Sequence, residues 1–198
     1  MRARAASAGL YGLVLLLFLA TPATPADFDT GVEAYDDGDY ATALAEWLPL
    51  ARDGDPAAQR NIGHLYRNGL GVDRDPKYAA EWYERAASAG LGRAQANLGA
   101  LYLTGDGVPQ DFSEAARWFT AASLQGHVIA QFYLGMLYEN GLGIGKNLSK
   151  ALALYELSAA ADYLPAQRAR ARLSGLDGAE AATDPAAPRF DMERSAAD

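Results

Sequence analysis

The sequence predicts an all-α protein: a right-handed α-solenoid in which helical hairpins stack on one another. The first observation is a repeat, because similar stretches recur every 36 residues, for example around Gln59, Gln95 and Gln131. The second is spacing: the large apolar residues of each stretch lie three and four positions apart, which is typical of helices rather than strands. A hairpin of this length cannot bury its apolar face alone, so neighbouring units must stack into one continuous core.

Residues 1–26 are predicted to be a secretory signal peptide. Arg2 and Arg4 precede an apolar run at 10–20, and small residues lead to a cleavage site after Ala26 or, as the weaker candidate, after Ala23. The apolar run is shorter than the roughly 20 residues that span a bilayer, although a retained membrane anchor is an open alternative. We therefore expect a periplasmic or secreted protein with no stable membrane insertion after cleavage.

Residues 27–54 are predicted to form an N-terminal cap hairpin with a shorter loop than the units that follow. The hairpin contains Gly31 and Trp47, and Pro49 lies inside its second helix. Because proline has no amide hydrogen and its ring clashes with the preceding turn, we expect Pro49 to kink or shorten that helix.

Three complete repeats follow, at residues 55–90, 91–126 and 127–162. In each repeat a glycine is positioned to end the first helix in a left-handed conformation, and a short polar side chain is positioned to cap the second helix. The predicted ends are Gly69, Gly105 and Gly141, and the predicted caps are Asp75, Asp111 and Asn147. Pro76 suits a first helical position, and Glu114, three residues after Asp111, resembles a capping box.

Each first helix also contains an internal glycine, namely Gly63, Gly99 or Gly135. Such a glycine costs about 1 kcal/mol relative to alanine, so we expect close contact between helices to offset the cost. The side chains expected to fill the space beside these glycines are Tyr66, Tyr102, Trp82 and Trp118.

Two segments complete the chain. Residues 163–173 keep part of the repeat pattern but carry Arg170 where the other units have an apolar residue, which indicates a C-terminal capping helix. Residues 174–198 are rich in alanine, proline and acids, a composition typical of a disordered acidic tail.

The stretch AQANLGALYLTGDGVPQDFSEAARWFTAASLQG at residues 94–126 resembles the Sel1-like repeat, a variant of the tetratricopeptide repeat. The resemblance covers residues 28–173, and the cap hairpin is similar to a tetratricopeptide unit. It implies an exported protein–protein interaction scaffold or adaptor that regulates or assembles a cell-envelope or signalling complex.

The same resemblance implies an alternative, because some cysteine-rich relatives are described as penicillin-binding or β-lactamase-like. Those relatives join their hairpins with disulfides, whereas this chain has no cysteine and no Ser-x-x-Lys motif. Its two histidines, His64 and His127, are too far apart in the repeat to be assumed to share a metal. We expect no enzyme activity, no catalytic residue, no cofactor and no metal, with a cell-wall-active or β-lactamase-like enzyme as the alternative.

The charge of the chain bears on its partners. The formal net charge is −8, and removal of residues 1–26 takes away two arginines and brings it to −10. An acidic protein is not steered toward nucleic acid or anionic membranes, so a protein or peptide is the expected partner.

The expected partner-binding groove follows from analogy with tetratricopeptide solenoids, in which the first helices line the concave face. The residues assigned to it are Phe28, Val32, Tyr35, Arg60, His64, Arg67, Arg93, Leu103, Phe132, Met136, Glu139, Arg168 and Arg172. Their arginines favour an acidic or extended peptide held by bidentate contacts. Two alternatives stay open: the arginine stems could simply cover apolar surface, or the acidic tail could occupy the groove.

Overall fold

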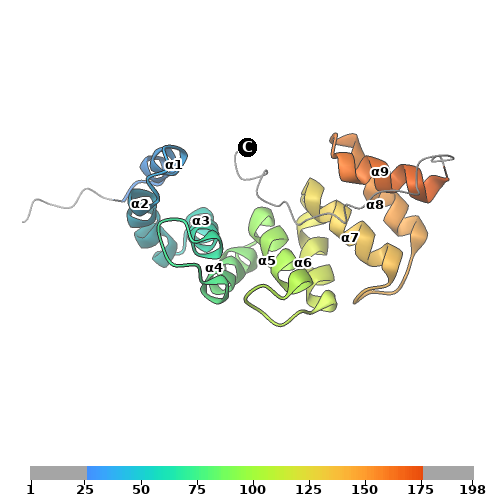
Figure 1. Ribbon diagram of the computed structural model, residues 1–198, viewed down its shortest axis with the longest axis horizontal. Helices are drawn as coiled ribbons and strands as arrows, with labels where there is room; N and C mark the ends of the chain where they lie inside the picture. Colours follow the sequence, from blue (N-terminus) through green and yellow to red (C-terminus); the bar gives the residue numbers. More distant parts are fainter. Residues whose placement is uncertain (1–25, 176–198) are drawn as a thin grey trace, which may run out of the picture.

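The computed structural model describes residues 26–175, which form nine α-helices and no strand (Figure 1). The helices are α1 (Phe28–Asp36), α2 (Tyr40–Arg52), α3 (Pro56–Asn68), α4 (Pro76–Ser88), α5 (Gly92–Thr104), α6 (Phe112–Leu124), α7 (Val128–Asn140), α8 (Leu148–Ala160) and α9 (Leu164–Ser174). The predicted signal peptide and acidic tail lie outside the described residues, apart from the one or two residues that adjoin the helices.

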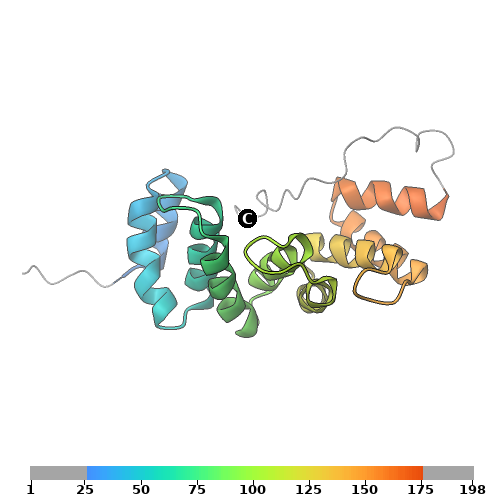
Figure 2. The ribbon, with the colours of Figure 1, turned by 60° about the horizontal axis from the view of Figure 1, so that its bottom comes forward.

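The helices follow one another in a single row, and each packs mainly on the helix before it and the helix after it. The row curves, so that α1 and α9, at its two ends, rise on the same side (Figures 1 and 2). The predicted all-α class and the stacking of hairpins are therefore confirmed. None of the described helices is long and apolar enough to cross a membrane.

The predicted helix ends are confirmed in all three repeats. Gly69, Gly105 and Gly141 are left-handed C-caps, with φ of 69°, 74° and 71°. The side chains of Asp75, Asp111 and Asn147 each accept a hydrogen bond from a backbone N–H in the first turn of the second helix. Local chain chemistry therefore sets where each hairpin begins and turns.

The predicted capping box at Asp111 does not close. The Glu114 side chain accepts from Arg117 Nη2 at 2.6 Å instead of reaching back. The Asp111 N–H donates to the carbonyl oxygen of Tyr102 at 2.9 Å. Since that amide is already bonded to the end of the first helix, it offers Glu114 no donor.

The internal glycines do lie at close helix contacts, but the aromatic side chains beside them differ from those predicted. A Cβ on Gly63, Gly99 or Gly135 would lie 2.8, 2.9 or 2.8 Å from a ring carbon of Tyr83, Phe119 or Tyr155, respectively. Tyr83 and Phe119 each follow the predicted tryptophan by one residue. One position rotates a helical side chain by about 100°, which directs it to a different neighbour.

Trp82 and Trp118 pack against the preceding hairpin. Trp82 belongs to the core formed with α2 and α3, and Trp118 to the core formed with α4 and α5. Their outer faces carry the guanidinium groups of Arg85 and Arg117, 4.4 and 4.0 Å from the ring centroids. The tryptophans thus join successive hairpins, while the glycine contacts join the two helices within one.

Pro49 does not shorten its helix, contrary to expectation. Helix α2 runs for 13 residues through Pro49, as long as the helices of the complete repeats. The proline lies in the last turns and its side chain is exposed, so the missing amide hydrogen affects only the end of the helix.

Candidate partner-binding site

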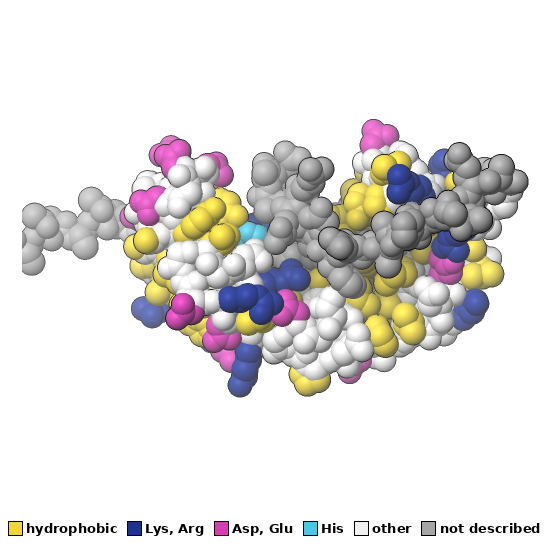
Figure 3. All heavy atoms as spheres, viewed as in Figure 1, with side chains coloured by type: hydrophobic (Ala, Val, Ile, Leu, Met, Phe, Trp, Pro, Cys, Tyr) yellow, Lys and Arg dark blue, Asp and Glu magenta, His cyan; other side chains and the backbone are white. Residues whose placement is uncertain are grey.

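A hollow of about 380 Å³ lies between α1, α3 and the start of α5. It is lined by Phe28, Val32, Tyr35, Asp36, Trp47, Ala57, Arg60, Asn61, His64, Leu91 and Arg93. Figure 3 shows hydrophobic side chains gathered over these N-terminal hairpins, beside a histidine and basic side chains. Of the predicted groove residues, Phe28, Val32, Tyr35, Arg60, His64 and Arg93 meet in this hollow.

Trp47 organises the apolar wall of the hollow. Its Nε1 donates to the carbonyl oxygen of Phe28 at 3.1 Å, and its ring centroid lies 6.1 and 5.8 Å from those of Phe28 and Tyr35. Gly31 makes room for the indole, because a Cβ there would meet Cδ1 of Trp47 at 2.7 Å. The sequence noted Trp47 in the cap hairpin without giving it a role, although the Gly31–Trp47 pair was the signal that could have placed it here.

His64 joins the wall to α3. Its Nε2 and the hydroxyl of Tyr35 are 2.9 Å apart and share a hydrogen bond, and Asn68 Nδ2 lies 3.2 Å from its Nδ1. Burial, followed by the positive charges of Arg60 and Arg67, lowers the pKa of His64 to about 4. The imidazole is therefore neutral near pH 7 and contributes a polar ring rather than a charge.

Arg60 supplies a partly buried positive charge to the hollow. Its Nη1 donates to Asn61 Oδ1 at 3.0 Å, while its Nε is buried without a hydrogen-bond acceptor. Burial lowers the pKa of its guanidinium, and the neighbouring charge of Arg93 acts in the same direction. Arg93 itself is exposed on α5, so two guanidinium groups border the same hollow.

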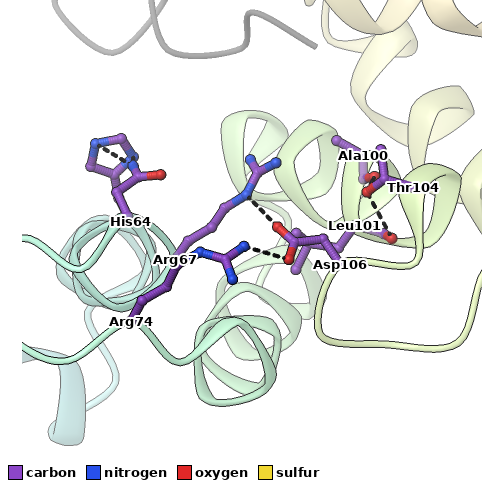
Figure 4. A network of polar contacts seen from close by, with 8 residues as sticks. His64, Arg67, Arg74, Ala100, Leu101, Thr104 and Asp106 are labelled. Atoms are coloured by element: carbon purple, nitrogen blue, oxygen red, sulfur yellow. Dashed lines mark hydrogen bonds and ion pairs between the residues drawn. The ribbon is translucent and has the colours of Figure 1, made fainter. Parts of the chain in front are cut away.

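Arg67 does not line the hollow, although the sequence placed it in the groove. Its Nε contacts Oδ2 of Asp106 at 3.3 Å, and Nη2 of Arg74 contacts Oδ1 of the same carboxylate at 2.7 Å. Figure 4 shows both arginines pointing toward Asp106, which lies in the loop after α5. The carboxylate thus links the first complete repeat to the second.

Leu103 and Phe132 are wrong as groove residues, because they are only 4% and 5% exposed. Phe132 packs among the rings of Tyr133, Tyr155 and Tyr163, and Leu103 belongs to the same core cluster. Met136 is partly buried against that cluster. Neighbouring helices cover Leu103 and Phe132, so these two side chains offer a partner no surface, whereas Met136 keeps part of its surface.

The remaining predicted residues lie at the C-terminal end, on α7 and α9. Arg172 forms an ion pair with Glu139 at 2.7 Å, and the hydroxyl of Tyr155 donates to Glu139 at 2.8 Å. Burial alone would raise the pKa of Glu139, but the hydrogen bonds from Arg172 and Tyr155 outweigh it and the pKa is lowered. Arg168 is exposed on α9. These residues fasten the last helix and are separate from the hollow.

Among residues 26–175, no group of three or more histidines, cysteines and acids is placed to hold a metal ion. What the hollow combines is aromatic surface, a neutral imidazole and two guanidinium groups. This combination suits recognition of a side chain that is partly apolar and partly anionic.

Comparison with known proteins agrees with this architecture. The Sel1 repeat profile matches residues 56–91, 92–127 and 128–163. A Sel1 repeat protein from Oxalobacter formigenes is 34% identical with a TM-score of 0.70, and the match covers 74% of this chain and 60% of that one. The protective antigen c5321 of uropathogenic Escherichia coli, which displays an SLR fold, is 34% identical with a TM-score of 0.71, over 77% of this chain and 33% of that one.

A third relative is the chitin synthase regulator SKT5 of Saccharomyces cerevisiae, which is 40% identical over 57 residues. That match covers 29% of this chain and 8% of the yeast protein. The chain thus spans a small part of the curated relative and less than two thirds of either solved structure. Sel1 repeat proteins generally mediate protein–protein interactions, and the fold is typically a non-enzymatic scaffold. The repeats, their boundaries and the shared architecture show that the chain belongs to the Sel1 repeat family.

Proposed function

We propose that this protein is an exported scaffold that holds an extended, acidic segment of a protein partner in the hollow between α1, α3 and α5. Through this contact it would regulate or assemble a complex of the cell envelope. The observation that carries the proposal is the hollow itself, where aromatic side chains of the cap hairpin meet Arg60 and Arg93.

The size and composition of the hollow favour a segment of chain as the ligand. A volume of about 380 Å³ is at the lower end of small-ligand sites, so it admits a few side chains rather than a folded surface. Tryptophan, tyrosine and arginine are the residues that most often dominate binding energy at protein interfaces. Tyr35 and Arg60 are partly exposed in this hollow, and Trp47, which is only 2% exposed, supports the wall from behind.

The local charge supports an acidic partner. Although the whole chain has a net charge of −8, Arg60 and Arg93 border the hollow, with Asp36 as its acidic residue. Bidentate contacts from arginine favour carboxylates. The net negative charge also supports the proposal that nucleic acid is not a partner.

A binding role also agrees with the protonation and hydrogen bonding of His64. The pKa of His64 at about 4 makes it a poor general base at neutral pH, and Tyr35 occupies its Nε2. The yeast relative is named as a regulator, which is consistent with a protein that acts by binding. Export rests on the segment at residues 1–26, as argued from the sequence.

The proposal is tested by site-specific photo-crosslinking in the native host. We would install p-benzoylphenylalanine in place of Val32, which lines the hollow, and separately in place of Leu157, which is 58% exposed on α8. We expect a discrete adduct with a protein partner from position 32 and none of the same mass from position 157. Arg93→Glu should reduce the adduct, whereas Lys77→Glu, an exposed charge reversal on α4, should not.

Two results would contradict the proposal. Adducts that form only from position 157 would place the binding surface elsewhere. Turnover of a chromogenic β-lactam or of peptidoglycan by the purified protein, if abolished by Arg93→Glu, would replace the scaffold with an enzyme.

A further inference from the structure

We infer that Arg60 binds the carboxylate of an aspartate or glutamate in the partner segment, and that a large apolar side chain two positions away packs on the aromatic wall formed by Phe28 and Tyr35. This inference deepens the proposed function and rests on it. It assigns Arg60 as the residue that determines specificity, and it names the sequence pattern that the hollow recognises.

The first step is an unsatisfied buried donor. The Nε of Arg60 is buried and has no hydrogen-bond partner, and Nη1 is the guanidinium atom that bonds to Asn61. A buried donor without an acceptor is costly, and more so when it carries a positive charge. Because Nε has no exposed surface, a ligand in the hollow would reach the guanidinium through Nη2, which has no hydrogen-bond partner among the described residues.

The second step is a contrast with other arginines of the described chain. Arg67, Arg74, Arg117 and Arg172 each contact a carboxylate oxygen within 3.3 Å. Arg60 makes no such ion pair within residues 26–175, although it is more buried than the exposed Arg74 and Arg117. Asp36 lines the same hollow without forming an ion pair to Arg60. The paired arginines thus include both the partly buried Arg67 and exposed residues, whereas the partly buried Arg60 has no carboxylate partner among the described residues.

The third step is the shape of the missing acceptor. Because Nη1 is bonded to Asn61 and Nε has no exposed surface, Nη2 is the guanidinium atom left to donate to a ligand. Its N–H groups lie in the guanidinium plane, where they can donate to a carboxylate oxygen. Asn61 fixes the orientation of the guanidinium before the ligand arrives.

The fourth step is the apolar half of the ligand. Phe28 and Tyr35 form an aromatic wall in the same hollow as Arg60, and the buried ring of Trp47 packs behind both. In an extended segment, side chains two positions apart point to the same side and lie roughly 6.5–7 Å from each other. One segment can thus place a carboxylate at Arg60 and an apolar side chain on the wall.

The test is a selection of displayed random heptapeptides on the purified full-length chain. We expect the enriched peptides to carry Asp or Glu two positions from Phe, Tyr, Trp, Leu or Ile. In a selected peptide, replacing the acid by its amide should weaken binding about tenfold or more, as expected for a hydrogen bond to a charged group. Arg60→Met should cause the same loss, and the two changes combined should cost little more than either one.

Arg170→Met is the matched control, because Arg170 is exposed on α9, away from the hollow. It should leave peptide affinity unchanged. If Arg60→Met does not fold, as judged by circular dichroism, the acid-to-amide change in the peptide still tests the inference on the unaltered protein. Arg60→Lys, which keeps the charge but lacks the planar fork, should also bind the acidic peptide more weakly.

Enrichment of peptides without an acid, or equal binding of the acid and amide forms, would overturn the assignment of Arg60. The proposed function would survive that result if the Val32 crosslink still forms, so the two failures are distinguishable. Tighter peptide binding by a chain ending at Gly175 would identify residues 176–198 as the competing occupant and overturn the assignment to a partner.

Discussion

The hydroxyl of Tyr35 on α1 and Nε2 of His64 on α3 lie 2.9 Å apart and share a hydrogen bond. The rings of the two residues are also in contact, with centroids 5.8 Å apart. This pair joins the cap hairpin to the first complete repeat at the edge of the hollow. Any change in the charge of His64 therefore acts on the candidate site and on the stacking of the first two hairpins together.

Lowering the pH from 7 to 5 should destabilise the protein through His64. Burial, then Arg60 and Arg67, lower its pKa from 6.5 to about 4 in the folded state. Between these values the unfolded chain binds more protons, so the free energy of unfolding falls as the pH falls, by about 1–2 kcal/mol for this residue. Urea denaturation at the two pH values measures the change. His64→Gln, which does not titrate, should reduce the pH dependence by that amount, and an unchanged dependence would contradict this account.

Gly99→Ala should destabilise the second repeat. The new Cβ would meet a ring carbon of Phe119 at 2.9 Å in a fully buried contact, and overpacking of this kind costs about 1–3 kcal/mol, of which the higher helix propensity of alanine offsets about 1 kcal/mol. Gly145→Ala is the control, because a Cβ there has nothing within 4 Å. Thermal denaturation should show a lower Tm for the first variant and little change for the second. Equal Tm values would mean that α5 and α6 can separate without cost.

Asp106→Asn should weaken the junction between the first two complete repeats. It removes the charge that pairs with Arg67 and Arg74, and the Arg67 and Asp106 side chains are only 17% and 23% exposed. We expect a loss of about 1–2 kcal/mol in urea denaturation. Glu114→Gln, which removes an exposed i,i+3 pair with Arg117, should cost about 0.5 kcal/mol or less. The reverse order would show that the Asp106 network is not a structural link.

Arg172→Met should loosen α9 without unfolding the rest of the solenoid. Arg172 pairs with Glu139 on α7, and α9 otherwise packs mainly on α8. Hydrogen exchange should become faster for amides of α9 while those of α3 and α5 stay protected. Uniform acceleration along the chain would instead indicate that the last helix supports every repeat.

The N-terminus of the protein purified from its native host should be Asp27, or Thr24 if cleavage occurs at the weaker site. The small residues before each position suit a signal peptidase. Intact-mass spectrometry distinguishes these products from the full chain. An intact Met1 in the membrane fraction would favour a retained anchor.

The sequence by itself determined the repeat, the helix boundaries and the family. These features depend on interactions within a few residues: Gly69 ends α3 because it can adopt a positive φ, and Asp75 caps α4 through its own side chain. The period of 36 residues then required the hairpins to stack. Such signals are readable because every copy repeats them.

Tertiary structure alone decided which side chains each helix face meets. Tyr83 rather than Trp82 packs on Gly63, and Phe132 is buried among tyrosines. Arg67 forms an ion pair with Asp106 of the next repeat. Periodicity gives the direction of a side chain from its own helix. It does not give the rotation and offset between successive hairpins, which decide whether the side chain packs against a neighbouring helix or is exposed to solvent. For this reason the sequence could propose a groove along every first helix, whereas the hollow between α1, α3 and the start of α5 brings together six of the thirteen predicted residues.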